Sequence, residues 1–132
     1  MQIRTALPSL EGATLAHAMR ELLMGLGRAF AHGLAVHPLP PLYVSGVRYA
    51  PEPNAGDGWE EWADPWTVHR RGWGDCDDLV AWRLAELLAA GEAVTVQVVG
   101  TGDGHRWGPR FHVRVRRADG TLEDPSIQLM GD

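Results

Sequence analysis

The only cysteine of the chain, Cys76, lies in the acidic stretch GDCDD, at the expected start of a helix. A thiol at a helix N-terminus experiences a partial positive charge that favours the thiolate, which is the reactive form of cysteine. The neighbouring Asp75, Asp77 and Asp78 act in the opposite direction and should raise the pKa of the thiol. The sequence does not decide between these effects, and a thiol buried in the core is the alternative for Cys76.

An imidazole close to Cys76 would favour nucleophilic chemistry, because it can accept the proton from sulfur. The candidate is His112 in FHVRVRR, and the candidate group to orient its ring is Asp124, expected on the next strand. With a hairpin turn near Asp119 and Gly120, residues 112 and 124 lie nearly opposite one another, within reach of a side-chain pair. The alternatives are a strand histidine with an ordinary hydrogen bond and an Asp-Pro strand terminator.

The helix that positions the thiol is expected to run from Cys76 to about Ala90. Asp75 is a favourable N-cap, acids suit the first turn, and Gly91 is a natural left-handed stop. One apolar stripe runs along this helix through Val80, Leu84, Leu87 and Leu88. Because Cys76 lies on the same stripe, its thiol should face whatever the helix packs against.

Beyond Gly91 the apolar period changes to two, which predicts strands over 93–100 and 111–117 and a short third strand at TLEDP. The order of residues along the second strand places His112 on the face opposite Phe111 and Val113. Two arrangements would bring the histidine to Cys76: helices on both faces of the sheet, or a bulge near Phe111.

The rest of the chain completes a single α+β domain over 1–132. We expect an extended start over 1–10, a helix over 11–31, a Pro-, Gly- and Trp-rich arm over 32–72 with a helical turn near Asp64-Pro65, a core over 73–126, and a tail over 127–132. Four tryptophans precede the cysteine and either fill the core or line a cleft. They are Trp59, Trp62, Trp66 and Trp73.

Composition excludes several classes of protein. A net charge of −5 argues against nucleic acid as the main partner, although RFHVRVRR is locally basic and is interpreted as a solvated or ion-paired face. No stretch has the length of a membrane span, and the start lacks a signal-peptide pattern, so a soluble cytoplasmic protein is expected. We expect no cofactor and no metal, because Cys76, His69, His105 and His112 lack the spacing of a zinc site.

Three segments together resemble the transglutaminase-like superfamily, which is related to papain-like cysteine proteases: GWGDCDDLVAWRLAELLAAG, FHVRV and ADGTLEDPS. Members carry a cysteine at a helix N-terminus, a histidine on one strand and an aspartate on the next. The resemblance covers about 73–126. With YVSGVRYAPEP included, the chain is also similar to small proteins encoded among the capsid and tail genes of tailed bacteriophages and prophages.

This resemblance implies a transglutaminase-like core and a catalytic triad of Cys76, His112 and Asp124 for thiol acyl chemistry on an amide of a protein or peptide, with either hydrolysis or crosslinking as the outcome. Papain-like enzymes use a glutamine shortly before the cysteine as oxyanion donor, and none lies there in this chain; transglutaminase-like proteins can use a tryptophan instead, and the resemblance leaves open which one. It also implies capsid or tail subunits as partners, in the host cytoplasm during assembly or in the virion. The alternative is a catalytically inactive assembly component that keeps only the fold.

Overall fold

The computed structural model describes residues 2–6, 12–51, 59–100 and 111–130. Residues 52–58 of the predicted arm and residues 101–110 between the two predicted strands lie outside this part of the chain. Within it the protein is α+β, with four α-helices, one 3-10 helix and seven strands that form three small sheets. The predicted α+β class is therefore confirmed.

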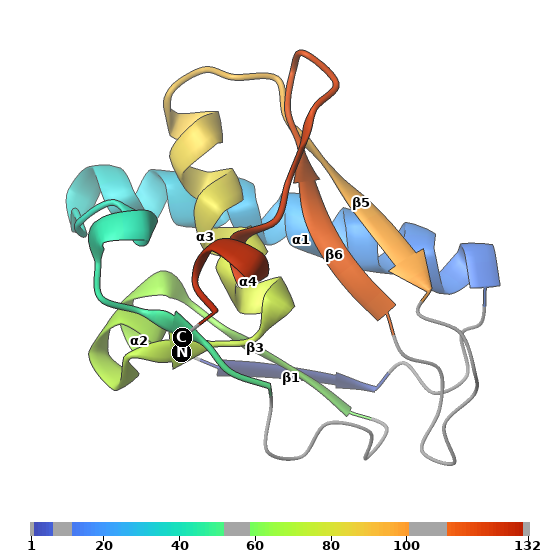
Figure 1. Ribbon diagram of the computed structural model, residues 1–132, viewed down its shortest axis with the longest axis horizontal. Coiled ribbons are helices and arrows are strands. Elements are labelled where there is room, and N and C mark those ends of the chain that lie inside the picture. The colour runs from blue at the N-terminus through green and yellow to red at the C-terminus, as the bar shows by residue number, and fades with distance from the viewer. Residues whose placement is uncertain (1, 7–11, 52–58, 101–110, 131–132) are drawn as a thin grey trace.

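Two helices form the centre of the molecule. The first, α1 (Gly12–Val36), runs beyond its expected end and packs against α3 (Cys76–Ala89), whose bounds agree with the prediction to one residue. In Figure 1, α1 crosses behind α3 and behind the largest sheet. At the C-terminal end of α3, Gly91 has a φ of 83°, which is the left-handed stop expected there.

A glycine lets the two helices approach closely. A Cβ on Gly27 would lie 3.0 Å from the Cβ of Leu84, tighter than ordinary van der Waals contact, whereas a Cβ on Gly25 would meet only open space. The two glycines do not end the helix, because packing on α3 outweighs their low helix propensity.

The largest sheet is antiparallel and has the order β5 (Thr95–Gly100), β6 (Phe111–Arg116) and β7 (Leu122–Glu123). The β5–β6 register is continuous from the Thr95–Arg116 pair to the Gly100–Phe111 pair, so no bulge interrupts it. The helix starting at Cys76 packs on this sheet, as predicted.

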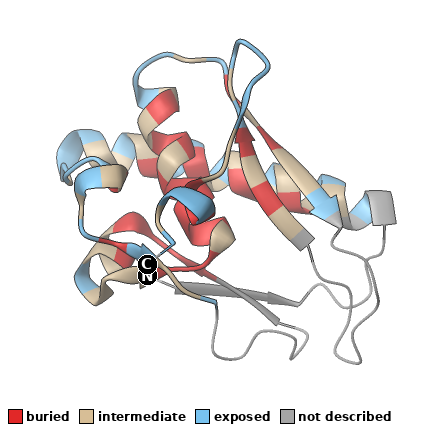
Figure 2. Cartoon of the chain, viewed as in Figure 1, coloured by how far each residue is buried: buried red, intermediate tan, exposed pale blue. Residues whose placement is uncertain are grey.

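Both central helices cover the same face of this sheet. Val96, Val113 and Val115 are buried in one cluster with side chains of α1 and α3, and Figure 2 shows this buried band along α3 and β6. Alternation along β6 directs His112 and Arg114 to the other side of the strand. The sequence suggested two arrangements that would bring His112 to Cys76: a helix on each face of the sheet, or a bulge near Phe111. Neither is found within the described residues.

Two smaller sheets join distant parts of the chain. The extended start contains β1 (Gln2–Ala6), which pairs antiparallel with β3 (Trp59–Ala63). In the arm, a 3-10 helix (Leu42–Val44) leads to β2 (Arg48–Tyr49), which pairs parallel with β4 (Trp73–Gly74), directly before the cysteine helix.

Two short helices each begin at the proline of an Asp-Pro pair. α2 (Pro65–Arg71) begins after Asp64, whose side chain accepts a hydrogen bond from the Thr67 N–H, as expected for a helical turn there. α4 (Pro125–Gln128) packs against α3 and lies partly where a tail is predicted. None of the helices in the described part of the chain has the length and apolar character needed to cross a bilayer.

Candidate active site

Cys76 is the first residue of α3, as the sequence predicts. Asp75 caps the helix: its Oδ1 accepts a hydrogen bond from the Asp78 N–H at 3.1 Å, while Asp78 Oδ2 accepts one from the Asp75 N–H at 3.3 Å. This reciprocal capping fixes the first turn. Cys76 itself is partly buried and packs against the main hydrophobic core. Because it is the first residue of the capped helix, it lies at the positive end of the helix dipole.

Two of the three acids beside the thiol are almost fully buried. Asp78 has strong donors: the Ala63 N–H and the Arg71 guanidinium both lie 2.9 Å from its carboxylate oxygens. Asp77 is 1% exposed, and its Oδ1 has no hydrogen-bond partner within the described residues.

The three acids therefore differ in the negative charge that they place near the thiol. Burial, and then the charge of Asp75, raises the pKa of both Asp77 and Asp78. Because only Asp78 has an arginine and backbone N–H groups to stabilise an anion, we assign the bound proton to Asp77. Asp75 is then the acid that opposes a thiolate at Cys76.

The predicted contact between the histidine and the aspartate is present. His112 Nε2 lies 2.7 Å from Asp124 Oδ2, and the two side chains are 33% and 13% exposed. The other oxygen of Asp124 accepts hydrogen bonds from the backbone N–H groups of Ser126 at 3.1 Å and Ile127 at 3.4 Å. A carboxylate held in this way requires the proton of the neutral imidazole on Nε2, which leaves Nδ1 as the basic nitrogen.

Asp124 belongs to a helix cap and not to a strand, contrary to the prediction. β7 ends at Glu123, and Asp124 is the N-cap of α4. The β6–β7 register pairs Val115 with Glu123, so Asp124 would face Arg114, and His112 lies two residues further along β6. The pair thus meets diagonally, where the third strand leaves the sheet.

Tyr49 is a site residue that the sequence reasoning missed. It lies on β2 opposite Gly74, two residues before Cys76. Burial, and then the charges of Cys76, Asp75 and Asp124, raises the pKa of its phenol. The phenol of Tyr49 is therefore within electrostatic reach of both the cysteine side and the histidine–aspartate side of the candidate site. Only a parallel pairing between residues far apart in sequence creates this position.

The four candidate tryptophans occupy different environments. Trp62 is buried in the main core, and the Trp66 indole N–H donates to the His37 carbonyl at 2.8 Å. The Trp73 ring lies under the Arg71 guanidinium, 3.6 Å from its centroid, in β4 next to the cysteine helix. The side chain of Trp59 lies outside the described part of the structure.

One cluster of potential metal ligands occurs among the described residues, and it consists of Asp75, Asp77 and Asp78, with ligand atoms within 4.8 Å of one another. A cation there would compete with Arg71 for Asp78. No histidine belongs to this cluster. His69 instead packs edge-on against Trp82, and His105 lies outside the described residues.

Comparison of the chain with protein-family models, curated proteins and solved structures finds no significant match.

Proposed function

We propose that the chain is a transglutaminase-like thiol enzyme that performs acyl chemistry on an amide, with Cys76 as nucleophile, His112 as base and Asp124 as the group that orients the base. The observation that carries this proposal is the 2.7 Å contact between His112 Nε2 and a carboxylate that is itself anchored by two backbone N–H groups. Tyr49 is consistent with it, because the charges of both Cys76 and Asp124 raise the pKa of its phenol.

The proposed reaction follows from the assigned tautomer. His112 Nδ1 takes the proton from the Cys76 thiol, and the thiolate attacks the amide carbonyl carbon, forming a C–S bond and an oxyanion. The backbone N–H of Cys76 and the indole N–H of Trp73 are the candidate oxyanion donors. The imidazolium then protonates the departing amine, which leaves an acyl-enzyme. Attack by water completes hydrolysis, and attack by a second amine completes a crosslink.

Alkylation by iodoacetamide tests the activated thiol directly, because Cys76 is the only cysteine and labelling has one possible cysteine target. At pH 6.5 we expect Cys76 to react at least about tenfold faster than N-acetylcysteine, and this excess to disappear in His112→Ala. His32→Ala, an exposed change on α1, is the control and should react like the wild type. Equal rates in all three proteins, no faster than N-acetylcysteine, would contradict the proposal.

The two acyl acceptors can be distinguished with one glutamine-containing peptide and a fluorescent primary amine. Incorporation of the amine, dependent on Cys76, indicates crosslinking. Release of ammonia or of a peptide fragment without incorporation indicates hydrolysis. Cys76→Ser is the blank for both products.

An assembly component of a phage head or tail that lacks turnover is the second candidate. It is favoured by the orientation of β6, on which His112 lies on the side opposite the valines that contact α3. The particle itself is proposed from the sequence resemblance. In this case, the chain and its Cys76→Ser variant should co-purify equally well with capsid or tail subunits encoded beside it, and a loss of binding on this substitution would argue against a purely structural role.

A further inference from the structure

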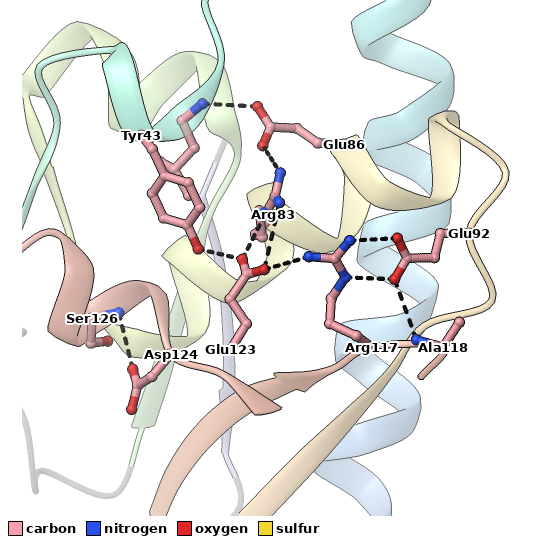
Figure 3. Close-up of polar contacts among 10 residues, drawn as sticks. Tyr43, Arg83, Glu86, Glu92, Arg117, Ala118, Glu123, Asp124 and Ser126 are labelled. Atoms are coloured by element: carbon pink, nitrogen blue, oxygen red, sulfur yellow. Dashed lines mark hydrogen bonds and ion pairs between the residues drawn. The ribbon is translucent and has the colours of Figure 1, made fainter. Parts of the chain in front are cut away.

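Glu123, the residue before Asp124, accepts hydrogen bonds from three separate parts of the chain: the 3-10 helix, α3 and the residue that follows β6. Arg83 Nε donates to its Oε2 at 2.6 Å, Arg117 Nη1 donates to its Oε1 at 2.8 Å, and the Tyr43 hydroxyl donates to its Oε2 (Figure 3). The Glu123 side chain is 11% exposed. Burial acts to raise the pKa of Glu123, but the hydrogen bonds from Arg83 and Tyr43 dominate and lower it, so the group is an anion at neutral pH.

The positions of Arg83 and Glu123 connect the two halves of the candidate site. Arg83 follows Cys76 by seven residues, which places it two turns along α3 on the same side of the helix, about 10 Å away along the axis. Glu123 is bonded through the backbone to Asp124. A contact between Arg83 and Glu123 therefore restrains the cysteine helix relative to the histidine–aspartate pair.

The hydrogen bonds of Asp124 itself are local, and α4, which it caps, contacts α3 by packing. These hydrogen bonds go to α4 and to His112, and β7 pairs with β6 over only two residues. Among the described residues, the side-chain hydrogen bonds that join β7 to α3 are those between Glu123 and Arg83. Tyr43 reinforces them, since its ring also lies 5.0 Å from the Arg83 guanidinium.

We infer that Glu123, held by Arg83 and Tyr43, is a positioning residue that fixes the His112–Asp124 pair against the N-terminus of the cysteine helix. This inference deepens the proposed function and rests on it for its catalytic meaning. Glu123 does not touch the reacting atoms and acts through Asp124.

The test compares two glutamate-to-glutamine variants of the same ion-pair network. Glu123→Gln removes the charge that ties Arg83 to β7 and leaves the ion pair of Arg83 with Glu86, at 3.1 Å within α3, in place. Glu92→Gln is the matched control, because Glu92 also forms a two-point ion pair, with Arg117, at 2.5 and 2.6 Å, but does not contact Arg83. For each variant, the pH profile of Cys76 alkylation and the NMR signal of the His112 Nε2–H proton are measured.

We expect Glu123→Gln to slow alkylation at pH 6.5 by about tenfold, to change the shape of its pH profile and to weaken the Nε2–H signal, because the pair is no longer held in place. Glu92→Gln should match the wild type in all three. Tyr43→Phe keeps the ring over Arg83 and removes one hydrogen bond, so it should give a smaller change in the same direction, and it serves if Glu123→Gln does not fold.

Failure of this inference is distinguishable from failure of the proposed function. If wild-type Cys76 is reactive and Glu123→Gln and Tyr43→Phe leave both its pH profile and the Nε2–H signal unchanged, the positioning role is overturned. Equal changes in Glu92→Gln would also overturn it, because they would indicate a general loss of stability. If wild-type Cys76 is unreactive, the proposed function fails, while loss of the Nε2–H signal in Glu123→Gln alone still supports positioning of the pair.

Discussion

Two neighbouring acids at the start of α3 show how burial and hydrogen bonding separate residues of the same type. Asp78 accepts from Arg71 and from the backbone, whereas Asp77 is equally buried without such donors at its Oδ1. An unshared negative charge at Asp77 would be costly in this environment, and protonation removes the cost. The net negative charge next to the Cys76 thiol thus depends on where this proton resides.

Asp77→Asn should leave the protein at least as stable as the wild type at pH 8. The pKa of Asp77 is raised above its usual value of 3.8, so the folded protein holds a proton that the unfolded chain releases. The wild-type free energy of unfolding therefore falls as pH rises from about 4 toward the raised pKa and stays low above it. Asparagine cannot lose this proton, so its advantage should shrink as pH is lowered toward 4.

Urea denaturation at several pH values measures this effect, with Asp78→Asn as the contrasting variant. That substitution breaks the buried ion pair with Arg71 and should cost about 3 kcal/mol at neutral pH. Similar losses in the two variants at pH 8 would show that Asp77 is also an anion in the folded protein.

At the scale of elements, the close approach of α1 to α3 depends on a glycine in α1. Gly27 faces the Leu84 Cβ, whereas Gly25, two residues earlier on the same helix, faces open space. The same substitution at these two positions changes helix propensity equally but packing differently. Comparing the two variants thus separates the contribution of helix propensity to stability from that of packing.

Gly25→Ala and Gly27→Ala should change stability in opposite directions. At Gly25, alanine gains up to about 1 kcal/mol of helix propensity without a clash. At Gly27 the new Cβ meets the Leu84 Cβ at 3.0 Å and must push the helices apart, so a net loss of about 1–3 kcal/mol is expected. Chemical denaturation of both variants checks this, and stabilisation by Gly27→Ala would mean that the interface yields easily.

Elements defined by local signals could be predicted, and those defined by distant pairing could not. Asp75 and Gly91 delimit α3 within one residue because caps act on their own helix. Pairing of β1 with β3 joins segments more than fifty residues apart, and no local pattern marks it. The Asp-Pro signal predicted a helical turn at Asp64 but was interpreted as a strand end at Asp124, where it also begins a helix.

The candidate site divides in the same way. The hairpin turn brings His112 and Asp124 together through a short loop, so their contact followed from the sequence. Tyr49 reaches the site only because β2 pairs with β4, and the choice among tryptophans depended on long-range contacts such as that of Trp66 with the His37 carbonyl.

At the scale of the whole molecule, two acids change the free energy of unfolding in opposite directions as the pH rises. The lowered pKa of Glu123 contributes stability that is present above its usual value of 4.5 and is lost as pH falls through the lowered value. The raised pKa of Asp77 has the reverse effect, because stability falls as pH rises toward it. Together they favour a maximum on the acid side of neutrality.

Thermal unfolding from pH 3 to pH 9 should therefore give a highest Tm at about pH 5. Glu123→Gln should flatten the decline in Tm below the maximum, and Asp77→Asn should flatten the decline above it. A maximum that stays sharp in both variants would assign the pH dependence to other groups.

The two oxygens of Asp124 connect the four-residue helix α4 to the His112 ring. One oxygen starts α4 through the Ser126 and Ile127 amides, and the other holds the His112 ring. Fraying of these four residues would thus release the imidazole at the same moment. The rate of hydrogen exchange at the Ser126 amide would accordingly report how often the ring is released. Any contact that stabilises α4 would therefore also restrain the His112 ring, more than ten residues earlier in the sequence.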